Sequence, residues 1–186
     1  MQEPARISTA SVLPVSLVLL KAQVHETDGY QDELLEFYLS VAAAHVENMT
    51  GRAITETSWR QVLDGFPEGG IVLPFGPLKA DSLTITYLDA SEATQAVDVA
   101  DLIVDGAAVE ARIDHVLGVW PDTSDQIASV TLEWVTSADP CPPELAQAVL
   151  MLAAHYFGNR EAVAVPAVAE VPLGVKALIA TQRRFK

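Results

Sequence analysis

Four histidines and one cysteine are the side chains of this sequence best suited to metal binding or nucleophilic chemistry. His25, His45, His115 and His155 are scattered, with no pair four residues apart and no HExxH motif. A metal site would therefore require the fold to gather residues that the sequence keeps apart. The pattern predicts locally packed or solvated histidines and no metal site.

Cys141 is the only cysteine, so the chain can form no intrachain disulfide. This favours a reducing compartment, or an assembly made in one. Cys141 lies between Pro140 and Pro142 and has no neighbouring Cys or His. We expect an inert thiol at the entrance of a helix rather than a nucleophile.

Motifs of other common active sites are absent. There is no GxSxG or SxxK pattern, and Gly69-Gly70 precedes a predicted strand rather than a GK[ST] motif. The acid pairs Asp32/Glu33 and Asp122/Asp125 are predicted to be solvated. The three tryptophans fall in strand-like segments and are expected in a core or an interface. The sequence predicts no catalytic residue and no cofactor.

The acidic groups are unevenly distributed. The formal net charge is −14, which argues against a nucleic-acid-binding face as the main function. Residues 173–186 contain four bases and no acid. A short basic tail on an acidic body suggests a segment that docks on another molecule, although a frayed C-terminus is an alternative.

The longest apolar run, Pro143 to Gly158, predicts a central core helix. Prolines suit its first turn, and its apolar residues fill nearly every angle around the axis. Such a helix is buried on most sides, in its own core or partly against a neighbouring subunit. Arg160 follows it directly and can either favour the helix dipole or reach a carboxylate on another element or subunit. Tyr156, Arg160 and Glu161 are therefore candidate interface residues.

Two further helices precede a β-rich region. Ser16 is predicted to cap a helix over Leu17–Val24. A second helix is expected over Tyr30–Met49, with Asp28 and Gln31 as its capping pair, Gly51 at its end and Glu33, Glu36 and Glu47 facing solvent. Alternating, β-branched segments then predict six strands: Thr55–Leu63, Ile71–Leu73, Ser82–Leu88, Val97–Val104, Val109–Ile113 and Ala128–Val135.

The predicted fold class is α+β: a small helical bundle, formed by N- and C-terminal helices, with an inserted antiparallel β-subdomain and an extended or helical C-terminal arm. The expected segments are 1–53 for the N-terminal helices, 54–136 for the β-subdomain, 137–171 for the core helix and linker, and 172–186 for the arm. Residues 12–20 are apolar, but Glu3, Pro14 and Lys21 argue against a signal peptide.

In this order, the segments resemble the head–tail connector (adaptor) family of long-tailed bacteriophages and gene transfer agents. The segments are VENMTGRAI, LPFGPL before SLTITYLD, VTLEW, PPELAQAVLMLAAHYFGNREAV and VPLGVKALIATQRR. Their succession covers about Leu17 to Arg184. The first fifteen residues fall outside the resemblance, and their role stays open.

The resemblance implies a ring, usually of twelve subunits, beneath the portal of a virion or virus-like particle assembled in the bacterial cytoplasm. Its partners would be the portal, further copies of itself and a stopper or tail-completion protein. DNA would pass through without sequence-specific binding, and no membrane is involved. Carried over to this chain, the portal-binding residues would be Val175, Lys176, Leu178, Ile179, Arg183, Arg184 and Phe185.

Two other functions stay open from the residues alone. One is an acidic interaction module or DNA mimic, which would be a monomer or dimer with a dispensable tail. The other is a hydrolase using His45, His155 and surface acids, which would require those groups to converge in a pocket.

The acidity also suits a conduit, because a negative lumen would let DNA slide.

Overall fold

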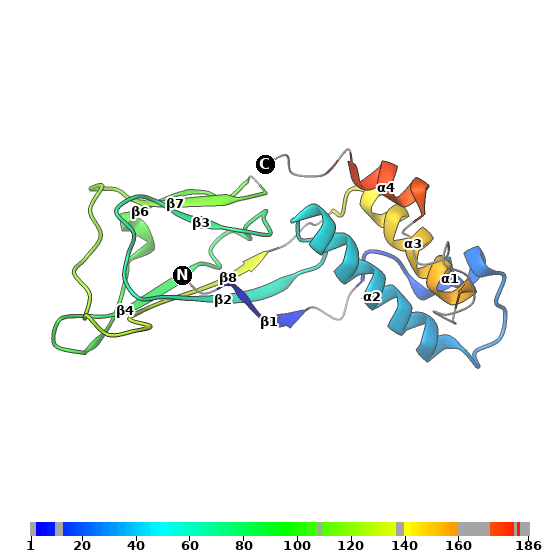
Figure 1. The fold of residues 1–186 in the computed structure, drawn as a ribbon, viewed down its shortest axis with the longest axis horizontal. Helices are drawn as coiled ribbons and strands as arrows, with labels where there is room; N and C mark the ends of the chain where they lie inside the picture. Colours follow the sequence, from blue (N-terminus) through cyan, green and yellow to red (C-terminus); the bar gives the residue numbers. More distant parts are fainter. Residues whose placement is uncertain are drawn as a thin grey trace. The chain divides into compact units, whose positions relative to one another are not determined.

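The computed structural model describes residues 3–9, 13–107, 109–136, 140–159, 172–180 and 182. The chain separates into two units, which we call the β unit (Met1–Ala10 and Glu56–Ala138) and the helical unit (Ser11–Thr55 and Asp139–Lys186) (Figure 1). The described residues form four α-helices and two antiparallel sheets. The predicted α+β class is confirmed.

Helix α3 (Pro143–Gly158) is the centre of the helical unit, and its bounds are those predicted. Helices α1 (Leu17–Val24), α2 (Asp32–Thr50) and α4 (Leu173–Ala180) all contact it (Figure 1). The buried α3 residues span roughly 200° around its axis: Leu145, Ala148, Val149, Leu150, Leu152 and Ala153. Partly buried apolar residues, among them Met151 and Ala154, extend this covered surface. The helix is apolar on most sides because helices cover it on most sides.

The helix ends confirm two predicted caps and contradict a third. Ser16 accepts a hydrogen bond from the Leu19 N–H at 3.3 Å and so caps α1. Gly51 ends α2 at φ 66°, a conformation that glycine adopts readily. The capping pair Asp28/Gln31 was wrong: Gln31 precedes α2 without a side-chain cap, and its amide binds Glu26 instead.

Glu47 was predicted to face solvent, and this was wrong, because the residue is only 2% exposed. Its Oε1 atom accepts hydrogen bonds from the Ile54 N–H at 2.9 Å, the Thr55 N–H at 3.1 Å and the Thr55 hydroxyl at 3.0 Å. A buried carboxylate is tolerated when donors surround it. Glu47 thereby holds the segment that leaves α2 against the end of that helix.

Helix α4 belongs to the same core. Val175 is 0% and Ile179 1% exposed, and both join the apolar cluster formed by α1, α2 and α3. Gly174 approaches α3 so closely that an added Cβ would lie 3.0 Å from the Met151 methyl. The C-terminal arm is therefore helical over these residues and packed against α3.

The β unit consists of two sheets that share one core. The five-stranded sheet has the order β1 (Ala5–Thr9), β2 (Thr57–Leu63), β8 (Val130–Thr136), β4 (Thr84–Leu88) and β5 (Thr94–Ala96). The three-stranded sheet has the order β3 (Ile71–Leu73), β7 (Ala111–His115) and β6 (Leu102–Asp105). Alternate residues of β2 and β8 are buried, as a half-buried strand requires.

Aromatic side chains fill the core between the two sheets. Trp59 and Trp134 lie opposite each other on β2 and β8. Trp59 stacks on Phe75 with ring centroids 4.4 Å apart, and its indole N–H donates to the Thr136 hydroxyl at 2.9 Å. The expectation that these tryptophans serve a core is confirmed for both.

The sequence analysis missed two strands and misplaced a third. Strands β1 and β5 were not predicted. The predicted strand Val97–Val104 was wrong in its first half, where Val99–Asp101 form a turn of 3₁₀ helix. The Asp98 side chain accepts the Ala100 N–H at 2.9 Å and starts this turn, a local bond that competes with strand pairing.

Replacing Glu47 by alanine should remove the acceptor of three buried hydrogen bonds. We expect Glu47→Ala to lower the free energy of unfolding by about 3 kcal/mol, measured by urea denaturation. Glu36→Ala removes an exposed carboxylate from the same helix and should change it by less than about 0.5 kcal/mol. Equal effects of the two substitutions would contradict the anchoring role of Glu47.

Truncating a buried residue of α4 should loosen this helix. We expect Ile179→Ala to reduce the hydrogen-exchange protection of the α4 amides by about 2 kcal/mol, because a buried side chain is lost from the core. Lys176→Ala, an exposed change on the same helix, is the control and should leave the protection within about 0.5 kcal/mol. Unchanged protection in Ile179→Ala would show that α4 is not held by this contact.

Candidate functional site

The four histidines occupy separate local environments. His25 ends α1 in the left-handed conformation, and the His155 ring lies 3.2 Å from the Asn159 side-chain nitrogen. In the β unit, the His115 ring accepts the Leu117 N–H and lies edge-on to Trp120. Among the residues that the structure describes, no three His, Cys, Asp or Glu side chains could together hold a metal ion. His25, His115 and His155 each serve their own turn or helix end.

Cys141 is half-buried at the entrance of α3, as the sequence predicted. Burial raises the pKa of its thiol, and the nearby Arg52 guanidinium opposes this shift only in part. A raised pKa leaves less thiolate at neutral pH, and the thiolate is the reactive form. This environment suits a packed thiol rather than a nucleophile.

The candidate interface residue Tyr156 lies where α3 faces α2. Its hydroxyl is 3.3 Å from the His45 Nδ1 atom, and its ring packs against Tyr38 with centroids 6.2 Å apart. Burial raises the pKa of the Tyr156 hydroxyl, so the group stays neutral and keeps its proton for hydrogen bonding. Tyr156 thus joins two helices of one chain, and Arg160 and Glu161 lie outside the described residues.

The candidate portal-binding residues separate into three groups. Val175 and Ile179 point into the core of the helical unit, and Leu178 is half-buried beside them. Lys176 is exposed on α4. Arg183, Arg184 and Phe185 lie outside the described residues. The described part of the arm therefore presents Lys176, not its apolar stripe, to a partner.

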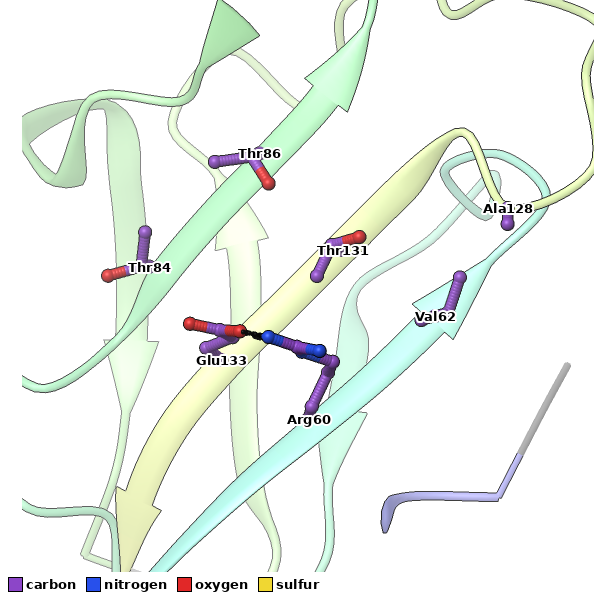
Figure 2. Close-up of a pocket in the computed structure, with 7 residues that line it drawn as sticks. All are labelled: Arg60, Val62, Thr84, Thr86, Ala128, Thr131 and Glu133. Atoms are coloured by element: carbon purple, nitrogen blue, oxygen red, sulfur yellow. Dashed lines mark hydrogen bonds and ion pairs between the residues drawn. The ribbon is translucent and has the colours of Figure 1, made fainter. Parts of the chain in front are cut away.

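The β unit has a shallow hollow of about 410 Å³ on the face of the five-stranded sheet that lies away from its core. Figure 2 shows its lining: Arg60 and Val62 on β2, Thr131 and Glu133 on β8, Thr84 and Thr86 on β4, and Ala128. The Arg60 Nε atom donates to the Glu133 carboxylate at 2.7 Å. These two charges compensate each other, so the hollow is close to neutral.

A second hollow, of about 470 Å³, is lined by aromatic rings and prolines. Phe66 and Trp120 stack with centroids 4.7 Å apart, and the Trp120 indole donates to the Gly69 carbonyl at 3.2 Å. Pro67 and Pro121 complete the apolar wall. These contacts hold two loops of the β unit together. Neither hollow is lined by a histidine or a cysteine.

The Arg60–Glu133 pair and the Glu47 anchor were both missed by the sequence analysis. Both depend on pairing between residues that are distant in the sequence or on opposite sides of a turn. The only available signal for Glu47 was its helical position, four residues after Ala43 and three before Thr50, both of which are buried.

No described helix is long and apolar enough to cross a membrane.

The chain is similar to chains in solved structures, but neither of the two sequence comparisons finds a match. No protein-family model matches the chain, and no characterised protein matches it by sequence comparison. A chain in the structure of the neck of an empty gene transfer agent (GTA) particle, computed with C6 symmetry, matches with a TM-score of 0.80 and 23% identity, covering 100% of this chain and 97% of the other.

Two further structures agree. A chain in the virion of a native GTA particle matches with a TM-score of 0.79 and 23% identity, again over 100% of this chain and 97% of the other. A chain in the neck of a native GTA particle, computed with C12 symmetry, has a TM-score of 0.65 and 25% identity over 97% of each chain. The chain therefore shares the fold of these GTA neck and virion chains, and the predicted resemblance is confirmed at the level of the fold.

Proposed function

We propose that this protein is a structural head–tail connector, an adaptor subunit in the neck of a phage-like particle. The observation that carries the proposal is the match of the whole chain, helical unit and β unit together, to a chain in a GTA neck at a TM-score of 0.80. A match of only one of the two units would support this function less, because one fold can serve many functions. The location proposed is accordingly the head–tail junction of a particle.

In this function the protein forms a ring of twelve copies beneath the portal. The GTA necks that contain the similar chains were computed with C6 and C12 symmetry, which supports a ring. A ring requires two different contact surfaces on each copy, one for each neighbour. A stopper or tail-completion protein would bind the other end of the ring.

The ring would surround the path of the DNA. Each copy carries a formal charge of −14, so twelve copies would carry −168. Such a charge disfavours adhesion of DNA phosphates to the wall. A conduit of this kind needs no catalytic group, and the described residues contain no metal-binding cluster.

The C-terminal segment 172–186 is the proposed portal-docking element. Because Val175 and Ile179 are buried in the helical unit, their role in this proposal is to hold α4 on α3. Lys176 and Leu178, followed by Arg183, Arg184 and Phe185, would then meet the portal. Acidic side chains at the rim of a portal cleft would complement the basic residues.

The central experiment mixes the purified protein with the portal protein of the same particle and weighs the product by native mass spectrometry. We expect a complex with twelve copies of this chain. A portal that binds none of it, at any ratio of the two proteins, would contradict the proposed function.

Removing the two arginines of the tail should weaken this binding. We expect Arg183→Ala/Arg184→Ala to raise the dissociation constant by roughly tenfold at low salt, and less at high salt because ions screen exposed charges. The control is Lys79→Ala/Arg112→Ala, which removes the same charge from the β unit. A control that weakens binding equally would show a general charge effect and no docking by the tail.

A further inference from the structure

The helical unit exposes two apolar surfaces that its own core does not use. We propose that neighbouring copies in the ring contact each other through these surfaces, the outer face of α1 in one copy and the outer face of α2 in the next. The inference rests on the proposed ring and identifies the surfaces that close it.

Helix α1 is apolar on two opposite sides. Leu20 is fully buried, and Leu17 and Val24 pack against the same cluster. On the other side, Val18 is 78% and Leu19 50% exposed. Apolar helix faces are normally covered, and the described residues leave this outer face of α1 exposed.

Helix α2 presents the second surface. Its buried residues form one stripe along the axis, and Phe37 and Val41 lie opposite that stripe, 60% and 37% exposed. They are four residues apart and therefore neighbours on one helix face. Glu33 and Glu36, both exposed, stand beside them. The outer face of α2 is thus an aromatic and aliphatic patch with an acidic border.

The charges of the two surfaces favour a contact between copies of this chain. Copies with a net charge of −14 repel each other, so a contact needs a surface without acids. Residues 4–25 contain no Asp or Glu, and Lys21 is the only charged residue of α1. Lys21 is paired with Asp32 of the same chain, so α1 presents little net charge and can approach the border formed by Glu33 and Glu36 without strong repulsion between like charges.

The size and asymmetry of the two surfaces fit a ring. Two different surfaces make a head-to-tail contact, which generates a closed ring when the rotation between copies allows it. Two or three side chains on each copy bury far less than the roughly 1,200 Å² of a stable isolated pair. The contact should be weak between two free copies and become persistent when a portal holds many copies side by side.

Disulfide trapping between two single-cysteine chains tests the contact directly. Cys141→Ser removes the only native cysteine. One chain then carries Val18→Cys and the other Phe37→Cys, so any mixed disulfide joins α1 of one copy to α2 of another. The chains are mixed at high concentration, with and without portal, and oxidised mildly; a disulfide forms only if the two Cα atoms come within about 7 Å.

We expect a mixed dimer, at twice the monomer mass of 19.9 kDa, to exceed either homodimer. The control mixes Val18→Cys with Gln147→Cys, an exposed site on α3, and should remain monomeric. Homodimers in excess, or no disulfide under either condition, would overturn the inference.

Substitution at the two surfaces gives an independent readout. Val18→Asp and Phe37→Asp should each abolish the twelvefold complex with the portal, without a change in helix content by circular dichroism. A normal twelvefold complex with both variants would refute the contact while leaving the proposed function in place. Failure of the unsubstituted protein to bind the portal, combined with a positive disulfide, would instead refute the function and keep the contact.

Discussion

The enclosure of α3 is the constraint on which the helical unit depends. This helix carries apolar side chains at nearly every angle, and Leu145, Val149 and Leu152 are fully buried. Two helices cannot cover such a surface, so α1, α2 and α4 all pack on it. The C-terminal helix is therefore a structural part of the unit, and any docking function of the tail is left to the side of α4 that faces away from this core and to the residues after it.

A single carboxylate then determines how the chain leaves this unit. Glu47 binds the backbone of Ile54 and Thr55, the last residues before the β unit. An apolar residue here would remove the acceptor of both N–H groups, and the loss of a buried hydrogen bond is costly. The burial of α3 depends on many apolar contacts, none of which requires one particular partner. The segment that follows α2 instead requires one hydrogen-bond acceptor at one position.

Periodicity predicted the helices well because their burial follows their own sequence. Leu17–Val24 and Pro143–Gly158 have the predicted bounds, and Ser16 and Gly51 are caps with local chemistry. The failures share a cause. Strand β1 is stabilised by β2, whose paired residues lie 48 to 55 positions away in sequence, and Glu47 is buried because a turn folds back over it. Pairing across such distances leaves no trace in the local pattern.

Functional residues were harder to predict because the described residues form no concentrated site. Val175 and Ile179 show why: an apolar stripe next to basic residues is typical of a docking helix and also of a core helix with a basic end. The stripe alone cannot distinguish the two, and in this chain the core uses it.

Charge limits where an acidic chain can meet copies of itself. Bases are few, and those of β2 and of the loop after β3 are paired with Glu133 and Glu56. The longest acid-free stretches are residues 4–25, 145–160 and 171–186, and most of the second lies in the core helix α3. Because repulsion between copies acts over about a Debye length, assembly contacts are least opposed at the first and the third. This distribution agrees with the proposed division, in which the first stretch serves the neighbouring copy and the third serves the portal.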